Sequence, residues 1–250
     1  MLKRFARCAP LLLFGVALAF ASDTVSEEFH QTYPLAATGQ VAVHNINGAI
    51  HVTAWDRNEV RVDAVKRGRD AEALKRAQIV VEASANAIDI HTKYPEDCHD
   101  CHGASVEYTL TVPRQAALDH IASVNGAVTI EGVTGSIKAS TVNGNVEIQR
   151  VSGDVDASTV NGRVEAAYER LSSGSVSLGT VNGAISLVFP KEVSAHLKAS
   201  TVHGGIHADF DLAVRNAGYG PGASVDSTLG GGGAEVKLHT VNGGIQLSRK

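Results

Sequence analysis

A recurring Val-Asn-Gly triplet is the feature of this chain that most restricts what it can fold into. Asn-Gly pairs begin at Asn125, Asn143, Asn161, Asn182 and Asn242, while His203-Gly204 occupies an equivalent place between the last two. The successive intervals are 18, 18, 21, 21 and 39 residues, the last being close to two repeats. Self-similarity at a period of this length is typical of solenoids and other repeat architectures.

Each turn is followed by a short alternation of apolar and polar residues. Val128 and Ile130 follow the first pair, and Val146 and Ile148 follow the second. Alternation over so few residues predicts a strand with one buried face. A second glycine comes nine residues after the turn glycine in two repeats, so a coil of about 18 residues would hold two strands and two turns; these glycines are Gly135 and Gly153.

The turns favour a solenoid over a series of hairpins. Asn-Gly supplies the positive φ angles of a tight turn, so hairpins would also use it. A meander, however, does not require successive turns to resemble each other, whereas coils stacked about 4.8 Å apart do. We therefore predict a β-solenoid in which the asparagines form an amide ladder and the valines a buried file. The turn ladder would consist of Asn125, Gly126, Asn143, Gly144, Asn161, Gly162, Asn182, Gly183, Asn242 and Gly243.

The first half of the chain is less regular. Apolar alternation flanks Asn47-Gly48, and strands are expected over residues 59–65, 79–82, 87–91 and 106–112. Residues 69–78 lack helix breakers and predict one short helix with Asp70 near its start. We expect an all-β protein with a β-rich section over residues 22–115 and solenoid repeats over 116–250. No Pro/Ser-rich linker separates the two, which favours one continuous body.

The first 21 residues predict a secretory signal peptide. Three cations, Lys3, Arg4 and Arg7, precede an apolar run over residues 11–20 that is short for a membrane span. An uncleaved anchor is the alternative. Loss of those cations changes the formal charge from −4 to −7, which argues against nucleic acid or an anionic membrane as partner. With no second apolar stretch long enough to cross a bilayer, we expect an exported protein of the periplasm or cell surface.

Three features together resemble one bacterial family. They are the turn and strand at 47–52, the strand at 108–112 that ends at Pro113, and the Asn-Gly ladder after it. A second strand that ends at Pro190 fits the same pattern. The chain resembles the putative-adhesin domain family of unknown function over residues 38–250. The resemblance implies an exported β-solenoid of the cell envelope, and it carries over no catalytic or ligand residue.

A Cys-x-x-Cys-His motif departs from that family pattern. Cys98, Cys101 and His102 match the attachment signature of c-type haem. The sole Met lies in the signal peptide, so a Met axial ligand is excluded. A disulfide between Cys98 and Cys101 is favoured in an oxidising compartment. A metal site that uses both thiolates with His99 or His102 is the third alternative.

Motifs for catalysis are otherwise scarce. Asp209 and Asp211 alternate, so on one strand they would project from the same side and could act as general acid and base of a carbohydrate-active enzyme. No nucleophile elbow, zinc-protease or phosphate-loop motif is present. We therefore expect no catalytic, cofactor or metal site. The predicted function is that of a non-catalytic adhesin or assembly scaffold that binds an envelope protein or glycan, or further copies of itself.

Overall fold

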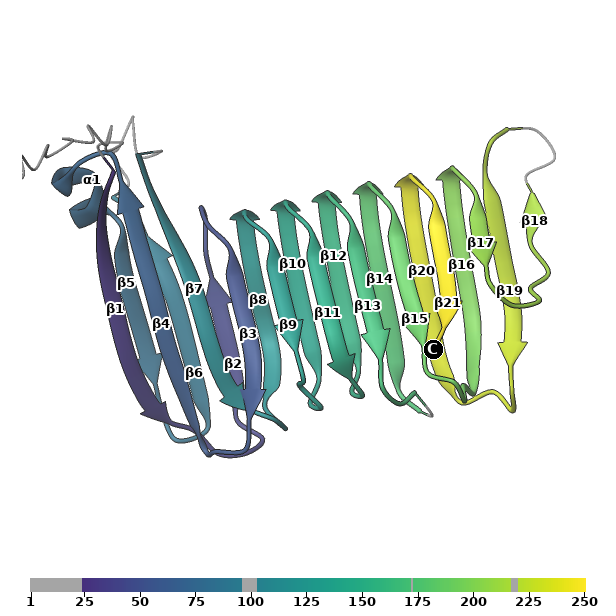
Figure 1. Cartoon of the computed structure of the whole chain (residues 1–250), viewed down its shortest axis with the longest axis horizontal. Coiled ribbons are helices and arrows are strands. Elements are labelled where there is room, and N and C mark those ends of the chain that lie inside the picture. The colour runs from purple at the N-terminus through teal and green to yellow at the C-terminus, as the bar shows by residue number, and fades with distance from the viewer. Residues whose placement is uncertain (1–23, 96–102, 172, 217–219) are drawn as a thin grey trace, which may run out of the picture.

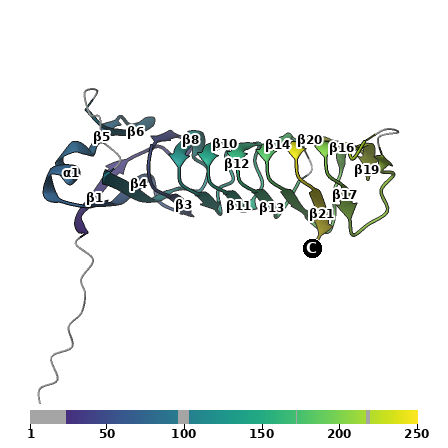
Figure 2. The same ribbon diagram turned by 90° about the horizontal axis from the view of Figure 1, so that it is seen from above.

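The computed structural model describes residues 24–95, 103–171, 173–216 and 220–250 as two long sheets that lie face to face. Figure 1 shows the strands side by side along the body, and Figure 2 shows the two layers from above. The signal peptide predicted over residues 1–21 lies outside the described residues.

Each layer is a mixed sheet. Sheet A has ten strands, in the spatial order β1 (Val25–Pro34), β4 (Glu59–Gly68), β7 (Ala104–Pro113), β3 (Ile50–Trp55), β9 (Val128–Glu131), β11 (Val146–Val151), β13 (Val164–Tyr168), β15 (Ile185–Phe189), β21 (Ile245–Arg249) and β17 (Ile206–Ala208). Sheet B has eleven strands, in the order β18 (Arg215–Asn216), β19 (Ala223–Leu229), β16 (Ala195–His203), β20 (Ala234–Asn242), β14 (Ser175–Asn182), β12 (Val155–Asn161), β10 (Ile137–Asn143), β8 (Ala117–Asn125), β2 (Gln40–His44), β6 (Ala87–Lys93) and β5 (Gln78–Ala83).

The solenoid prediction is confirmed. Each coil contributes one strand to each sheet, and equivalent strands pair in parallel, as in β10 with β12 and β11 with β13. The register places equivalent residues opposite each other, so that Asn143 faces Asn161. The predicted short helix is α1 (Ala71–Arg76), and Asp70 caps it by accepting a hydrogen bond from the Ala73 amide at 2.7 Å. Parallel coils occur on both sides of residue 116, because β2 and β3 stack directly on β8 and β9.

Two coils are out of sequence order. The coil of β2 and β3 lies between that of β6 and β7 and that of β8 and β9. At the other end, the coil of β20 and β21 is inserted between the coil of β14 and β15 and the coil of β16 and β17. The 39-residue interval has this cause: Asn242 stacks on Asn182, and His203 stacks on Asn242. Both coils therefore have parallel neighbours on each side.

Antiparallel strands cover the ends of the stack. β1 and β4 extend sheet A beyond β7, and β5 extends sheet B beyond β6. At the far end, β19 pairs antiparallel with β16, and the two-residue β18 lies outside it. A change to antiparallel pairing and a very short edge strand both limit further edge-to-edge addition of chains.

The interior is a narrow core of aliphatic side chains. Inward positions such as Val146, Ile148 and Val155 are buried, as the alternating pattern predicts. Three larger rings, Tyr108, Tyr168 and Phe189, are fully buried as well. The expected buried file of valines divides into two sets. Valines after the turn face the core, whereas those directly before each Asn are exposed or, at Val241, half-buried, because the preceding threonine or Ser123 takes the inward position.

Glycine is required in these turns for a different reason from the positive φ angle that the sequence predicted. Gly48 has a φ of 123°, but the φ values of Gly126, Gly144, Gly162, Gly183 and Gly243 are not in the left-handed region. A Cβ built on each of these five would lie 1.8 to 2.2 Å from the carbonyl oxygen of the stacked glycine in the neighbouring coil. Glycine is therefore required because two backbones approach too closely for a side chain.

Candidate functional site

Buried threonines hold the turns before five strands of sheet A, which are β9, β11, β13, β15 and β21. The Thr141 hydroxyl donates to the Gly126 carbonyl at 2.9 Å, and the Thr159 hydroxyl donates to Gly144 at 2.9 Å. The same bond recurs at Thr180, Thr240 and Thr201, at 3.0, 3.0 and 2.8 Å. These threonines lie in the core, so their hydroxyls satisfy turn carbonyls that would otherwise be buried without a partner.

The asparagines form a hydrogen-bonded ladder along the surface. The Asn143 side-chain amide donates to Asn125 at 2.9 Å, and Asn161 donates to Asn143 at the same distance. The ladder continues from Asn161 through Asn182 to Asn242, and it reaches Asn47 at its other end. Each amide from Asn125 to Asn242 donates one of its two N–H groups within the ladder, so the second can bond to a ligand or to water.

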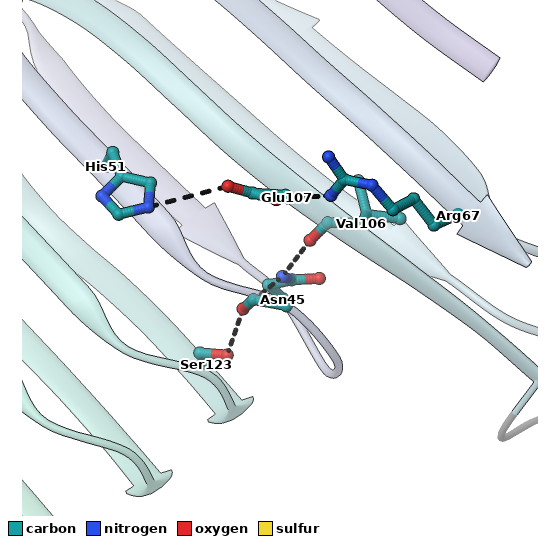
Figure 3. A network of polar contacts seen from close by, with 7 residues as sticks. Asn45, His51, Arg67, Val106, Glu107 and Ser123 are labelled. Atoms are coloured by element: carbon teal, nitrogen blue, oxygen red, sulfur yellow. Dashed lines mark hydrogen bonds and ion pairs between the residues drawn. The ribbon is translucent and has the colours of Figure 1, made fainter. Parts of the chain in front are cut away.

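At its N-terminal end the threonine ladder gives way to other residues. The Ser123 hydroxyl donates to the Gly48 carbonyl at 3.1 Å, and one coil further the buried Asn45 amide donates to the Val106 carbonyl at 2.8 Å (Figure 3). The Asn45 oxygen in turn accepts a bond from Thr92 at 2.9 Å. Asn45 takes the position of the threonine in its turn. Its longer side chain reaches Val106 in the next coil, which has no Thr-Val-Asn-Gly turn of its own.

The outer face of sheet A carries a glutamate with a basic side chain on each side of it. Glu107 lies between His51 and Arg67, which come from the strands on either side of it (Figure 3). The three side chains are between 39 and 53% exposed, so the contribution of these contacts to stability is small.

A line of exposed aliphatic side chains runs beside the asparagine ladder. Adjacent members lie one strand spacing apart, so the line extends for about 29 Å. Six of its members are between 39 and 47% exposed, and the seventh, Val241, is half-buried. It follows the edge of the body where the strands of sheet B turn toward sheet A, at the top in Figure 1. We call it the Val stripe, and its members are Ile46, Val124, Val142, Val160, Val181, Val241 and Val202.

Small side chains form the next row of the outer face of sheet B. A shallow groove lies there over Gly179, Ser200 and His239, with Arg215 and Asp226 among its lining residues. The Ser200 hydroxyl and His239 Nδ1 are 3.0 Å apart. Among the described residues no carboxylate contacts the other nitrogen of His239. The pair therefore lacks the third group that orients the base in nucleophilic catalysis.

Two histidines and an aspartate meet on sheet B near its N-terminal end. His44 of β2 lies opposite His91 of β6, and their rings stack with centroids 4.7 Å apart. Asp89 Oδ1 lies 3.0 Å from His91 Nε2 and 3.7 Å from His44 Nε2. His120 of β8 stacks on the other side of His44, at 5.0 Å.

The electrostatics of this cluster centre on His44. Burial lowers the pKa of His44; Asp89 opposes this change, and the neighbouring His91 and His120 add to it. His44 is therefore mainly neutral at pH 7, with a lone pair on one ring nitrogen.

The acidic pair expected on one strand is not on a strand. β17 ends at Ala208, and both Asp209 and Asp211 lie in the exposed loop after it. The Asp209 carboxylate accepts a hydrogen bond from the Arg249 amide at 3.1 Å, so it caps the end of β21. The prediction that both aspartates project from the same side of one strand was therefore wrong, because β17 ends one residue before Asp209.

The cysteine motif cannot be placed. Cys98, Cys101 and His102 lie outside the described residues. The disulfide, metal and haem alternatives for this motif remain predictions. Within the described residues, no helix has both the length and the apolar character needed to cross a membrane.

Sequence reasoning missed both the Val stripe and the histidine cluster. The stripe had a signal, since a polar residue, mostly Thr, precedes the aliphatic residue in each turn and only one of the two can face the core. The cluster had none, because His44 and His91 are 47 residues apart and no repeat relates them.

Comparisons with known proteins give one family and several distant folds. No curated protein matches the chain. A putative cell adhesion protein from Clostridium sporogenes is 13% identical, with a TM-score of 0.43 over 90% of this chain and 100% of that one. Putative adhesins from Bacteroides fragilis and Parabacteroides distasonis are 10% and 8% identical, with TM-scores of 0.36 and 0.29, each over 90% of this chain and 97% of its own. The family model described as Toastrack DUF4097 matches residues 36–248, so the chain belongs to the Toastrack family, and the resemblance drawn from its turns is confirmed.

Proposed function

We propose that this chain is a non-catalytic binding protein of the cell envelope that holds a protein partner on its Val stripe. The observation that carries the proposal is the repeated exposure of an aliphatic side chain at one position in successive coils. Single exposed apolar residues are ordinary on protein surfaces, but a contiguous line of them marks an interaction site.

The stripe is rigid before any partner binds. Its valines alternate with buried threonines whose hydroxyls bond to the turn, and the adjoining asparagines bond to each other. A preorganised surface loses little conformational entropy on association, which favours affinity. The second N–H of each Asn amide supplies a polar rim beside the apolar line. A partner strand or helix with an apolar face and exposed carbonyl or carboxylate groups would match both rows.

Polar substitution of the stripe tests this proposal. The variant Val142→Thr, Val160→Thr and Val181→Thr keeps side-chain shape and β-propensity at exposed positions, so the fold should be retained. The matched control, Glu147→Gln and Glu165→Gln, changes the outer face of sheet A in the same coils.

Wild-type chain and both variants would be immobilised and exposed to envelope extract of the source bacterium, and the bound proteins identified. We expect one protein to be retained by the wild type and the control and lost from the stripe variant. Sedimentation of the free chain measures whether it self-associates, as it should if the bound protein is a second copy of the chain. Equal retention by all three forms, or binding to a glycan array that the stripe variant leaves unchanged, contradicts the proposal.

A further inference from the structure

The cluster of His44, Asp89 and His91 has the composition of a metal site. Among the described residues it is the one group of three His, Cys, Asp or Glu side chains whose ligand atoms all lie within 4.8 Å of one another. From this geometry we propose that the three side chains bind one divalent transition-metal ion of the Zn²⁺ class.

Strand register brings these ligands together. His44 and His91 are direct partners across the parallel pair of β2 and β6, and Asp89 lies two residues before His91 on the same outer face. Ligands two residues apart on a strand project from the same side. Tetrahedral zinc with bonds near 2.0 Å places ligand atoms about 3.3 Å apart. The imidazole rings of His44 and His91 are nearly parallel, with planes 7° apart, so one ring must rotate for both nitrogen lone pairs to point at one ion.

Asp89 provides an independent sign that something is to be bound. Its Oδ1 is the one buried side-chain nitrogen or oxygen without a hydrogen-bond partner among the described residues. His91 Nε2 approaches it to 3.0 Å, but the pair does not have the alignment of a hydrogen bond. A buried oxygen without a hydrogen-bond partner is destabilising, and a cation bound between the two histidines would give this oxygen a partner.

His120 and an irregularity in β8 complete the surroundings. The register between β2 and β8 shifts between Val41 and Ala42, so that Asp119 is passed over and His120 lies opposite Ala42. Bulges of this kind re-aim side chains next to functional sites. The His120 ring then stacks on His44 and restrains the His44 imidazole.

The ligand set indicates which metals fit. Imidazole nitrogen suits Zn²⁺, Cu²⁺ and Ni²⁺, and one carboxylate is common beside two histidines in zinc sites. Three protein ligands leave a coordination position for water or for a ligand from a partner. The proposal does not depend on the Val stripe, because none of the three ligands belongs to it.

Calorimetric titration with Zn²⁺ tests the site. The untagged chain would carry Cys98→Ser and Cys101→Ser, so that the thiolates do not contribute. We expect one Zn²⁺ per chain with a micromolar dissociation constant. Replacement of a ligand, in His91→Ala or Asp89→Asn, should weaken binding at least tenfold. His44→Gln serves as a variant that preserves side-chain volume where alanine perturbs the fold, and circular dichroism would verify folding.

His239→Ala is the matched control, because His239 is exposed on the outer face of the same sheet without two further ligands. It should bind Zn²⁺ as the parent does. The electronic spectrum of a Co²⁺ complex supplies a second readout, which should show tetrahedral coordination in the parent and lose it in His91→Ala. Absence of binding at 100-fold excess of Zn²⁺, or equal affinity in the ligand variants and the parent, would overturn the proposal. An equal loss in His239→Ala would show adventitious binding to surface histidines only, with the same consequence.

Discussion

Gly144→Ala should destabilise the solenoid far more than an ordinary glycine substitution. A Cβ at Gly144 would lie 2.2 Å from the Gly126 carbonyl oxygen and 2.6 Å from its carbon. Real Cβ contacts below 3.0 Å essentially do not occur, so the backbone must move by about 0.8 Å. Gly144 and Gly126 also donate hydrogen bonds of 3.1 Å to the neighbouring asparagine carbonyls. Overpacking costs about 1–3 kcal/mol and two weakened bonds about 1 kcal/mol each, so we expect a loss of about 3–5 kcal/mol.

Gly179→Ala is the matched control from the same region. Gly179 lies in β14 with ordinary φ, and the nearest atoms to its Cβ position are 4.0 Å away. Alanine there restricts the unfolded chain without a clash, which should stabilise by about 0.4–1 kcal/mol. Both variants remove one glycine from the repeats, so composition is identical and only the site differs.

Urea unfolding followed by circular dichroism compares the two variants with the wild type. We expect a lower midpoint for Gly144→Ala, a midpoint equal to or above wild type for Gly179→Ala, and similar slopes for all three. Solenoid coils contact only their neighbours, so a separate early transition of the coils around Gly144 is also consistent with the clash. Coincident midpoints for the two alanine variants would refute the argument that close backbone approach selects glycine in these turns.

Other predictions follow from the buried polar groups. Thr159→Val keeps the side-chain shape but leaves the Gly144 carbonyl without its donor at 2.9 Å, so the free energy of unfolding should fall by about 1–3 kcal/mol. The control Thr129→Val changes an outward-facing side chain and should have little effect. Equal unfolding curves for the two variants would contradict this prediction. Burial raises the pKa of Tyr108 to about 12, although its bond to Thr92 acts in the opposite direction. Unfolded tyrosine ionises near pH 10, so the unfolded state binds fewer protons between pH 10 and 12, and stability should fall as pH rises through that window. Tyr108→Phe should reduce this slope in unfolding measured across alkaline pH, and an unchanged slope would show that Tyr108 does not contribute.

Much of the local structure could be predicted, because the repeats carry it explicitly. Strand positions after each turn follow from alternation, and the helix capped by Asp70 follows from its composition and N-cap. β1 (Val25–Pro34) was missed, since its side chains are mostly exposed and give no apolar periodicity. It pairs with β4 through backbone hydrogen bonds that no side-chain pattern records.

The candidate sites were harder to predict than the fold. The Val stripe depends on which of two alternating residues faces inward, and small polar threonine fills the tight corner that valine was expected to occupy. The interpretation of Asp209 and Asp211 as an acid–base pair depended on where a strand ends, and an apolar pattern locates strand ends poorly. The His44 cluster depended on β2 lying beside β6, although the chain visits them 47 residues apart.

The sequence by itself determined that this chain winds into stacked coils, because a repeated turn with an amide and a glycine at fixed positions satisfies its hydrogen bonds only against a copy of itself. Only the tertiary structure decided the order of the coils. The turns of the coils are nearly equivalent to one another. The coil of β2 and β3 and the coil of β20 and β21 would therefore have similar neighbours in sequence order and in the observed inserted order, and local sequence cannot distinguish the two orders. In the observed order antiparallel strands pair with β6 and β7 at one end of the parallel stack and with β16 at the other.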